Sequence, residues 1–339
     1  MALSVNPQTQ HQEGTPILLA RGAVPAYPHP VNIFALVDRN TGEVSITDPG
    51  SFTAEGLKCL EDGLAARRIE WRQIKHVLLT HGHFDHYGLA SYVVEKSGAV
   101  VYCHRREADR VNGSFKNPFI KDEAATVSFF RQMGCREEKI AEVLKAAQKA
   151  NDFARPVPGE NLRLVDGGDL ISCGQVELQV IHTPGHTMGS VCYLCAENNF
   201  LLTGDTLMEG VTPNPIFEII SPLEAETFMS VIRYRESLLR LEQFSGVAAY
   251  PGHGRWPLPA GFLAREMLSH FASRQKLIAG CLEAGEKTAA EIADIVFPDV
   301  HGYHIFLALS EVVGHLGCLW EAGTVTYRRE NGVFCWRLK

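Results

Sequence analysis

Long apolar runs are missing from this sequence. No stretch approaches the roughly 18 consecutive apolar residues that a membrane-spanning helix needs. The polar segment from Met1 to Gly14 also lacks the apolar centre of a secretory signal peptide. We therefore expect a cytoplasmic protein that has no membrane partner.

An excess of basic charge is missing too. The 339 residues carry a formal net charge of −7, whereas proteins that bind nucleic acids or membrane surfaces are more often basic. The nine cysteines are scattered and odd in number, which favours reduced thiols over a disulfide framework. Cys192 and Cys195 form a Cys-x-x-Cys pair, but no second pair completes a zinc knuckle, so we expect ordinary strand residues.

What the sequence does contain, up to about Pro257, is a series of short apolar strands that end in loops rich in glycine, aspartate and histidine. The predicted strands are Val31–Val37, Val44–Thr47, Ile74–Leu79, Val100–Cys103, Val176–Ile181, Ser190–Leu194, Phe200–Leu202 and Val247–Tyr250. Helices are predicted over Ala54–Ala66 and over Pro222–Leu241, the second with Ser221 as its N-cap. Strands separated by helices indicate a layered α/β catalytic domain over residues 1–257.

A helical insertion interrupts this pattern over about residues 105–160. Ala125–Met133 predicts one helix, and residues 136–150 predict a second, with Ile140 and Val143 at helical spacing. Because the insertion follows the strand after the histidine-rich loop, it can form a lid or wall of an active-site cleft. A plain packing role stays open as the alternative.

The remaining residues, 258–339, are predicted to form a second domain of three helices and a hairpin. The helices cover Gly261–Ala284, Thr288–Val296 and His304–Ala322, and the hairpin pairs Val325–Tyr327 with Val333–Trp336. Thr288 and Glu291 have the spacing of a capping box. This order is typical of a winged-helix domain.

Charge argues against nucleic-acid recognition by this second domain. Residues 255–339 contain nine Lys or Arg and nine Asp or Glu, and the segment His304–Ala322 contains no Lys or Arg. A helix that reads a nucleic-acid groove needs basic or amide groups. We expect a packing, cleft-shaping or dimerising role, and we leave a homodimer open.

Metal-binding side chains are concentrated in one loop. His81, His83, Asp85 and His86 place four metal-competent groups within six residues directly after a predicted strand. Three further candidates, His186, Asp205 and His253, each follow another predicted strand and lie beside glycine, where the backbone can approach an ion. Seven candidates exceed one tetrahedral site, so we expect two divalent ions about 3.5–4 Å apart with a shared carboxylate and a shared hydroxide. Zinc is expected, with manganese or iron as alternatives.

These residues resemble the signature of the metallo-β-lactamase superfamily over roughly residues 15–255. The resemblance implies an αββα sandwich. It also implies that His81, His83 and His186 hold one metal and that Asp85, His86 and His253 hold the other, with Asp205 bridging the two. Asp48 matches the family's aspartate that braces the metal loop from outside the ligand set.

The tail resembles the winged-helix domain of the beta-lactamase-like-protein 2 group within that superfamily. The matching residues run from Ala308 to Leu316, followed by Leu319 and by Glu321–Val325. Residues 28–32 lack the Gly-Thr-Asn-Thr-Tyr run of that group. True β-lactamases of the superfamily place cysteine where Asp205 stands and lack His86, so antibiotic hydrolysis is not expected.

Function follows from this resemblance and from hydroxide chemistry. We expect Asp85 and Asp205 to be catalytic, in the hydrolysis of an ester, thioester or lactone of a small metabolite. No Gly-x-Ser-x-Gly nucleophile motif is present. A metal-dependent ribonuclease or phosphodiesterase, and a mononuclear-iron persulfide dioxygenase, stay open as alternatives. Position alone suggests substrate contacts for Tyr87, Asn214 and Phe217.

Overall fold

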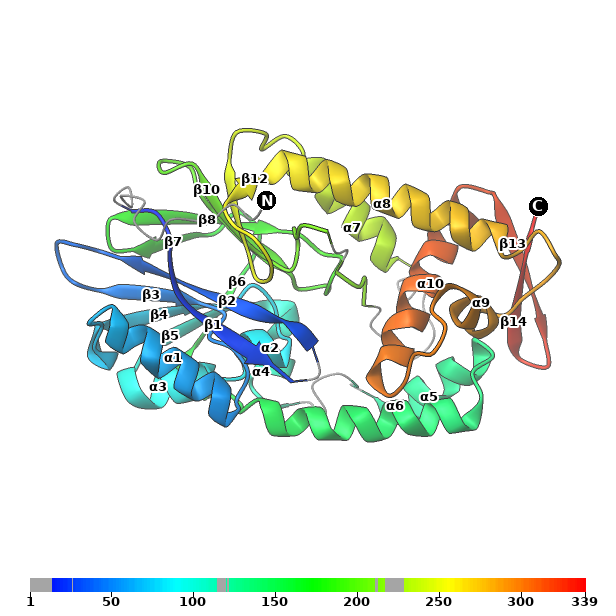
Figure 1. Ribbon diagram of the computed structural model, residues 1–339, viewed down its shortest axis with the longest axis horizontal. Helices are drawn as coiled ribbons and strands as arrows, with labels where there is room; N and C mark the ends of the chain where they lie inside the picture. Colours follow the sequence, from blue (N-terminus) through cyan, green and yellow to red (C-terminus); the bar gives the residue numbers. More distant parts are fainter. Residues whose placement is uncertain (1–13, 26, 115–119, 121, 211–212, 217–228) are drawn as a thin grey trace, which may run out of the picture.

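Two β-sheets and a separate group of helices make up the structure, a computed structural model that describes residues 14–25, 27–114, 120, 122–210, 213–216 and 229–339. The sheets face each other on one side of the molecule, and the helices and a small hairpin gather on the other side (Figure 1). Among the described residues, no helix combines the length and the apolar character needed to cross a membrane.

The first sheet combines antiparallel and parallel strands. Its spatial order follows the sequence, from β1 to β6. Strands β1 to β3 pair antiparallel and strands β3 to β6 pair parallel. Their bounds are β1 Ile17–Val24, β2 Tyr27–Val37, β3 Val44–Thr47, β4 Ile74–Leu78, β5 Val100–His104 and β6 Leu162–Val165. The hairpin of β2 and β3 confirms the prediction for that region.

The second sheet is antiparallel except for one pair, β10 and β11, which run parallel. The strand order is β12-β11-β10-β9-β8-β7. The bounds are β7 Leu170–Cys173, β8 Val176–His182, β9 Val191–Cys195, β10 Phe200–Gly204, β11 Ala248–Pro251 and β12 Leu258–Pro259. This alternation brings the carboxyl ends of β8, β10 and β11 to the same edge of the sheet.

Helices cover both outer faces of the sheet pair. Helices α1 (Ala54–Ala66) and α3 (Ala90–Ser97) contribute to the apolar cluster on the outer face of the first sheet. Helix α7 (Ser230–Leu241) and the first half of α8 (Ala260–Gly280) pack on the second sheet. Between the sheets lies a third cluster that includes Phe34, Tyr193 and Phe200. The predicted αββα sandwich is therefore confirmed.

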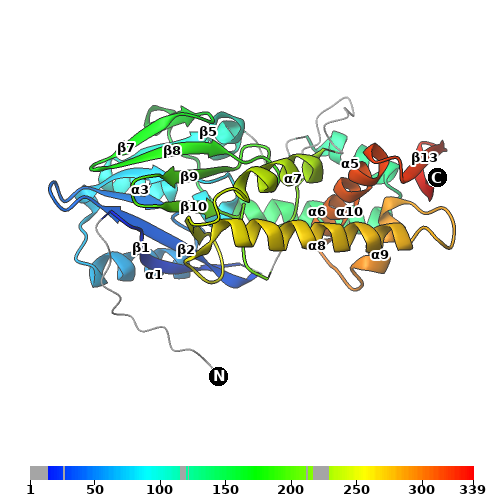
Figure 2. The ribbon, with the colours of Figure 1, turned by 90° about the horizontal axis from the view of Figure 1, so that it is seen from above.

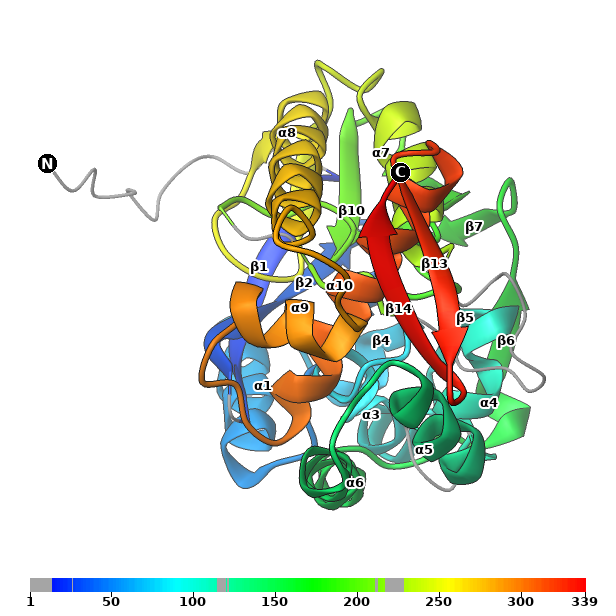
Figure 3. The ribbon, with the colours of Figure 1, turned by 90° about the vertical axis from the view of Figure 1, so that its right-hand side faces the viewer.

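Helices from two distant parts of the sequence share one apolar core. Helices α5 (Glu123–Gln132) and α6 (Glu137–Ala150) pack with α9 (Ala289–Val296), α10 (Tyr303–Glu321) and the hairpin β13 (Val325–Glu330) and β14 (Val333–Leu338). We call this assembly, with the second half of α8, the helical unit; Figure 3 shows its hairpin and helices facing the viewer. Buried Phe130 and Ile140 of the insertion meet Val312 and Trp336 of the tail in this core. The insertion and the tail therefore depend on each other for burial.

Helix α8 connects the two parts of the molecule. It runs from the sandwich to the far end of the helical unit (Figure 2). Leu263 and Met267 pack on the sandwich side, whereas Ile278 packs in the helical unit. The predicted domain boundary between residues 257 and 258 falls just before β12, a strand of the second sheet, and before the helix that both parts share; the division stays a prediction. The winged-helix assignment of the tail also stays a prediction.

Other local expectations have mixed outcomes. The helix predicted over Pro222–Leu241 is described from Ser230 to Leu241, and the predicted N-cap Ser221 lies outside the described residues. The capping box of Thr288 and Glu291 is present at α9. All nine cysteines are free thiols, and Cys192 and Cys195 on β9 enter different apolar clusters, as expected for opposite faces of a strand.

Candidate metal centre

The histidine-rich loop follows β4 at the edge of the first sheet. His81 lies at a bend, His83 lies in extended backbone, and Asp85 and His86 lie on the one-turn helix α2 (Phe84–Tyr87) that begins after His83. Asp48, which follows β3, accepts hydrogen bonds from the Thr80 amide (2.9 Å), the Thr80 hydroxyl (2.8 Å) and His86 Nδ1 (3.0 Å). The buried Asp48 carboxylate therefore fixes both the start of the loop and one of its histidines.

The second sheet supplies the other three candidates. His186 lies in the connection between β8 and β9, Asp205 directly follows β10, and His253 follows β11. A Cβ on Gly252 would come within 2.7 Å of both Asp205 Oδ1 and His86 Cε1. Glycine is needed there because the two sheets approach each other so closely at this point.

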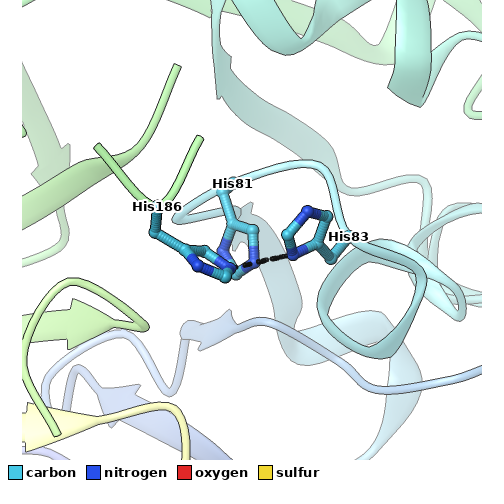
Figure 4. Close-up of side chains that lie close together, drawn as sticks. All are labelled: His81, His83 and His186. Atoms are coloured by element: carbon cyan, nitrogen blue, oxygen red, sulfur yellow. Dashed lines mark hydrogen bonds between the residues drawn. The ribbon is translucent and has the colours of Figure 1, made fainter. Parts of the chain in front are cut away.

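Three histidines form the first group of converging nitrogen atoms. His83 Nδ1 lies 3.0 Å from His81 Nε2 and 2.9 Å from His186 Nε2 (Figure 4). All three side chains are buried. Three ring nitrogens directed at one point are the ligand set that a divalent transition metal prefers.

A second group lies next to the first, with Asp205 between them. Asp85, His86 and His253 offer atoms within 4.8 Å of one another. Asp205 Oδ2 lies 3.7 Å from His186 Nε2, while its Oδ1 lies 3.4 Å from His86 Nε2 and 3.7 Å from His253 Nε2. One oxygen of Asp205 thus faces each group. All seven residues predicted from the sequence come together at this one place.

The outer nitrogen of each of four histidines has its own hydrogen-bond partner. His186 Nδ1 donates to the Asn214 carbonyl (2.8 Å), and His253 Nδ1 donates to the Pro30 carbonyl (2.9 Å). His86 Nδ1 donates to Asp48, and His81 Nδ1 lies 3.1 Å from the Thr80 hydroxyl. A proton held on Nδ1 leaves the lone pair of Nε2 directed inward. Each of these rings is therefore oriented for metal binding.

Charge and burial also fit bound cations. Burial lowers the pKa of His81 and His83 well below the ordinary value, which keeps both rings neutral, as ligation requires. Burial would raise the pKa of Asp85, but His86 and His253 outweigh it and lower that pKa to about 2. The carboxylates of Asp48, Asp85 and Asp205 therefore gather negative charge in a buried space, and such charge needs compensation.

Two buried atoms test whether the site fits metal ions. His86 Nε2 and Asp205 Oδ1 have no hydrogen-bond partner among the described residues. Leaving such atoms without a partner costs free energy, about 1–3 kcal/mol each and more for charged groups. The two atoms lie 3.4 Å apart beside the second group, where a cation would satisfy both of them. The donor set therefore fits divalent metal ions.

A buried carboxylate near the centre was not singled out from the sequence. Glu107, fully buried, accepts hydrogen bonds from the Thr187 hydroxyl (2.7 Å) and the Gly189 amide (3.0 Å), and it pairs with Arg110. Its Oε2 would also lie 2.5 Å from a Cβ on Gly82. Glu107 therefore braces the loops of His83 and His186 against each other. The feature of the sequence that could have pointed to Glu107 is its position as an acidic residue shortly after the end of β5.

Two tyrosines were also missed. The ring of Tyr27, at the start of β2, lies edge-on to the ring of His253, with centroids 5.5 Å apart. Burial raises the pKa of Tyr27 to about 12, with further contributions from Asp205 and Asp85, so its hydroxyl is protonated at neutral pH. Tyr303, at the start of α10, has a buried hydroxyl whose pKa is raised by burial and further influenced by Arg110 and Asp85. The electrostatic influence of Asp85 thus reaches both phenols.

The three predicted substrate contacts have different positions. Tyr87 is only 4 % exposed and packs in the outer cluster of the first sheet, so its contact with a substrate stays a prediction. Asn214 lies beside His186, and its Oδ1 is buried without a hydrogen-bond partner among the described residues. Phe217 lies outside the described residues.

Comparison with known families agrees with this geometry. The sequence model of the Metallo-beta-lactamase superfamily matches residues 26–253, about two thirds of the chain. The chain belongs to the metallo-beta-lactamase superfamily. The matched region begins just before Tyr27 and ends at His253, so it contains all seven converging side chains.

Similar proteins include hydrolases by name. The chain is 25 % identical to a probable metallo-hydrolase of Bacillus subtilis, YqjP, over 84 % of this chain and 90 % of that protein. It is 28 % identical to a probable polyketide biosynthesis zinc-dependent hydrolase of the same organism, over 58 % of this chain and 64 % of that protein. With the superfamily match, these relatives identify the chain as a metal-dependent hydrolase that binds divalent metal ions.

Solved structures show that the whole architecture occurs elsewhere. A metallo-beta-lactamase family protein from Thermus thermophilus superposes with a TM-score of 0.78 at 27 % identity, over 96 % of this chain and 98 % of that one. A beta-lactamase domain protein from Burkholderia ambifaria gives 0.77 at 21 % identity, over 98 % and 96 %. The helical unit is therefore part of a shared fold that includes the sandwich.

Proposed function

We propose that this metallo-beta-lactamase superfamily member uses two divalent metal ions to hydrolyse an ester, thioester or lactone bond of a small metabolite. The observation that carries the proposal is the position of Asp205 between two groups of three ligand candidates. His81, His83 and His186 would hold one ion, and Asp85, His86 and His253 the other. Zinc is the proposed metal, supported by the name of the zinc-dependent relative.

The chemistry divides between the metals and the chain. Bound divalent ions lower the pKa of coordinated water and polarise the oxygen of a carbonyl group. Asp85, with 14 % of its side chain exposed and a lowered pKa, is ionised and placed to orient the attacking water and accept its proton. The phenol of Tyr27, protonated at neutral pH, is a neutral donor whose ring lies beside His253.

Several observations favour a small acyl substrate over a nucleic acid. The chain is 28 % identical to an acyl-coenzyme A thioesterase of Gallus gallus, over 52 % of this chain and 54 % of that protein. Helix α10, the candidate recognition helix, has thirteen buried residues and forms the centre of the helical unit, so it offers no free face to a groove. The balanced charge of residues 255–339 points the same way.

Metal analysis combined with a substrate panel tests the proposal. We expect two equivalents of metal per chain, and turnover of at least one thioester, ester or lactone that depends on those ions. The panel also contains a phosphodiester, single-stranded RNA and glutathione persulfide. One iron per chain with oxygen uptake on the persulfide, or turnover of RNA alone, would contradict the proposal.

Substitution of a ligand candidate supplies the first specific prediction. His83→Ala and Asp205→Ala should each abolish metal occupancy and hydrolysis together, because each removes a ligand that no neighbour replaces. Elemental analysis and turnover are measured on the same samples. The matched control is His104→Ala, which also removes a buried histidine at a strand end and should keep both metals. Full activity in a metal-free His83→Ala protein would refute the assignment.

A further inference from the structure

A short segment lies between one metal-ligand candidate and the helical unit. Residues 213–216, which we call the linking segment, have the sequence Pro-Asn-Pro-Ile. The Asn214 carbonyl accepts the hydrogen bond of His186 Nδ1 at 2.8 Å, and the Ile216 amide donates to the His186 carbonyl at 3.1 Å. The linking segment therefore holds His186 at both its side chain and its backbone.

The same segment is anchored on its other side by α10. The hydroxyl of Ser310, a fully buried residue of that helix, donates to the Pro215 carbonyl at 2.8 Å. The side chain of Ile216 is 8 % exposed and belongs to the apolar core of the helical unit, which also contains Leu309 and Val313. One polar and one apolar contact thus fix the segment to α10.

Two prolines make the linking segment stiff, so that a movement of the Pro215 carbonyl also displaces the Asn214 carbonyl. Proline fixes φ at Pro213 and Pro215, and each proline also restricts the residue that precedes it, which for Pro215 is Asn214. Only φ and ψ of Pro215 separate the peptide that carries the Asn214 carbonyl from the peptide that Ser310 holds, and the proline ring fixes φ. A shift of the Pro215 carbonyl would turn the Asn214 carbonyl away from His186.

We propose that α10 sets the orientation of the His186 ring through Ser310 and the linking segment, so that the helical unit completes the metal centre. Ser310 is then a positioning residue that touches neither metal nor substrate. The inference rests on the proposed role of His186 as a metal ligand. It explains why residues more than ninety positions apart in the sequence meet at this point.

The test compares two buried serines in the full-length chain. Ser310→Ala removes the donor to Pro215, whereas Ser230→Ala removes an equally buried hydroxyl that also packs against α10 but has no hydrogen-bond partner among the described residues. We expect Ser310→Ala to weaken the affinity of one metal site about tenfold, the lower end of the effect for outer hydrogen-bond partners of ligands. Metal affinity is measured by competition with a chelator.

A spectroscopic readout separates positioning from general destabilisation. In the cobalt-substituted protein, Ser310→Ala should shift the visible absorption of the ion at the site with three histidines, while Ser230→Ala should match the wild type. Urea unfolding of both metal-free variants measures their structural cost. Ile216→Ala removes the apolar anchor and should shift the same absorption.

Each outcome bears on the inference. Equal metal affinity and equal spectra for Ser310→Ala and Ser230→Ala would overturn it, as would a spectral change in both. A wild-type chain that binds no divalent ion would overturn both this inference and the proposed function. Metal binding by the wild type without turnover of any acyl substrate would overturn the proposed function alone, because affinity and spectra still report on Ser310.

Discussion

Asp205 shows how single side chains decide the chemistry of this centre. Its two oxygens face different groups of ligand candidates, at 3.4 and 3.7 Å from the nearest nitrogens of His86 and His186. A cysteine at this position has one ligand atom and does not offer two separated oxygens. The close approach also depends on Gly252, since any larger residue would collide with Asp205 and His86. The Asp205 carboxylate and Gly252 are thus needed together for this close approach.

Tyr27 gives a prediction at this scale. Tyr27→Phe should lower kcat/KM about tenfold, roughly the 1.4 kcal/mol of one hydrogen bond to the reacting group, and leave metal content unchanged. The reason is that its neutral hydroxyl lies near Asp85 and Asp205 while its ring contacts His253. Steady-state kinetics and elemental analysis are the measurements.

The control for Tyr27 is a second tyrosine of the sandwich. Tyr250→Phe removes a phenol whose ring packs against Phe34 and Trp256 in the core between the sheets, and it should not change kcat/KM. If Tyr27→Phe has wild-type kinetics, the phenol has no part in binding or turnover. Loss of metal from Tyr27→Phe would instead indicate that the hydroxyl supports the metal centre and not the reaction itself, because phenylalanine keeps the ring that contacts His253.

Helix α10 is the element on which the helical unit is built. It is buried along most of its length, and it includes the ionisable residues Glu311 and His315. Glu311 pairs with Arg274 of α8 at 2.6 Å. His315 faces Arg274, His270 and the ring of Phe271, all from α8, and its Nδ1 has no hydrogen-bond partner among the described residues. A charged imidazole is therefore strongly disfavoured there.

His315 makes the stability of the helical unit depend on pH. Burial, reinforced by Arg274 and His270, lowers the pKa of His315 to about 3, against about 6.5 in an unfolded chain. As the pH falls below 6.5, His315 is protonated in the unfolded chain but stays neutral in the folded chain. The free energy of unfolding therefore decreases with falling pH, down to about pH 3. Between pH 6.5 and 5 the loss is on the order of 2 kcal/mol.

Substitution of His315 isolates its contribution to the pH dependence of stability. His315→Asn should reduce the difference in unfolding free energy between pH 7 and pH 5 by about 2 kcal/mol, as measured by urea unfolding of the metal-free protein. His301→Asn, at a side chain 81 % exposed, is the control and should leave the difference unchanged. An unchanged pH dependence in His315→Asn would show that His315 is charged in the folded protein.

At the scale of the whole molecule, residues from both sheets meet at the candidate metal centre. His81, His83, Asp85 and His86 come from the first sheet, and His186, Asp205 and His253 come from the second. Bound ions would therefore link the two halves of the sandwich. A ligand that binds only the folded state stabilises it by about 4 kcal/mol when present at a thousand times its Kd.

Metal removal tests this link. Treatment with a chelator should lower the Tm of the wild type by several degrees, and added zinc should restore it. His83→Ala is the control, because a protein without metal should not respond to the chelator. A wild-type Tm that is independent of both chelator and zinc would show that the centre adds no stability.

Much of the sandwich and its centre follows from local patterns. Strand β4 and the loop after it were predicted because a short segment that contains Ile74, Val77 and Leu78 leads straight into a cluster of histidines. The helix Ala54–Ala66 was predicted with its observed bounds. Strands β6, β7 and β12 were not predicted, since each has at most four residues, too few for the pattern to stand out from the surrounding loops. Strand β1 was missed because its alternation is interrupted by irregular pairing with β2.

The sequence by itself determined the seven candidate metal ligands, because so many imidazole and carboxylate side chains at strand ends beside glycine have few other roles in proteins. It did not determine that the insertion and the tail share one core, nor that Glu107, Tyr27 and Ser310 lie beside or behind the centre. Those relations depend on contacts between distant segments, which only close packing of the folded chain decides.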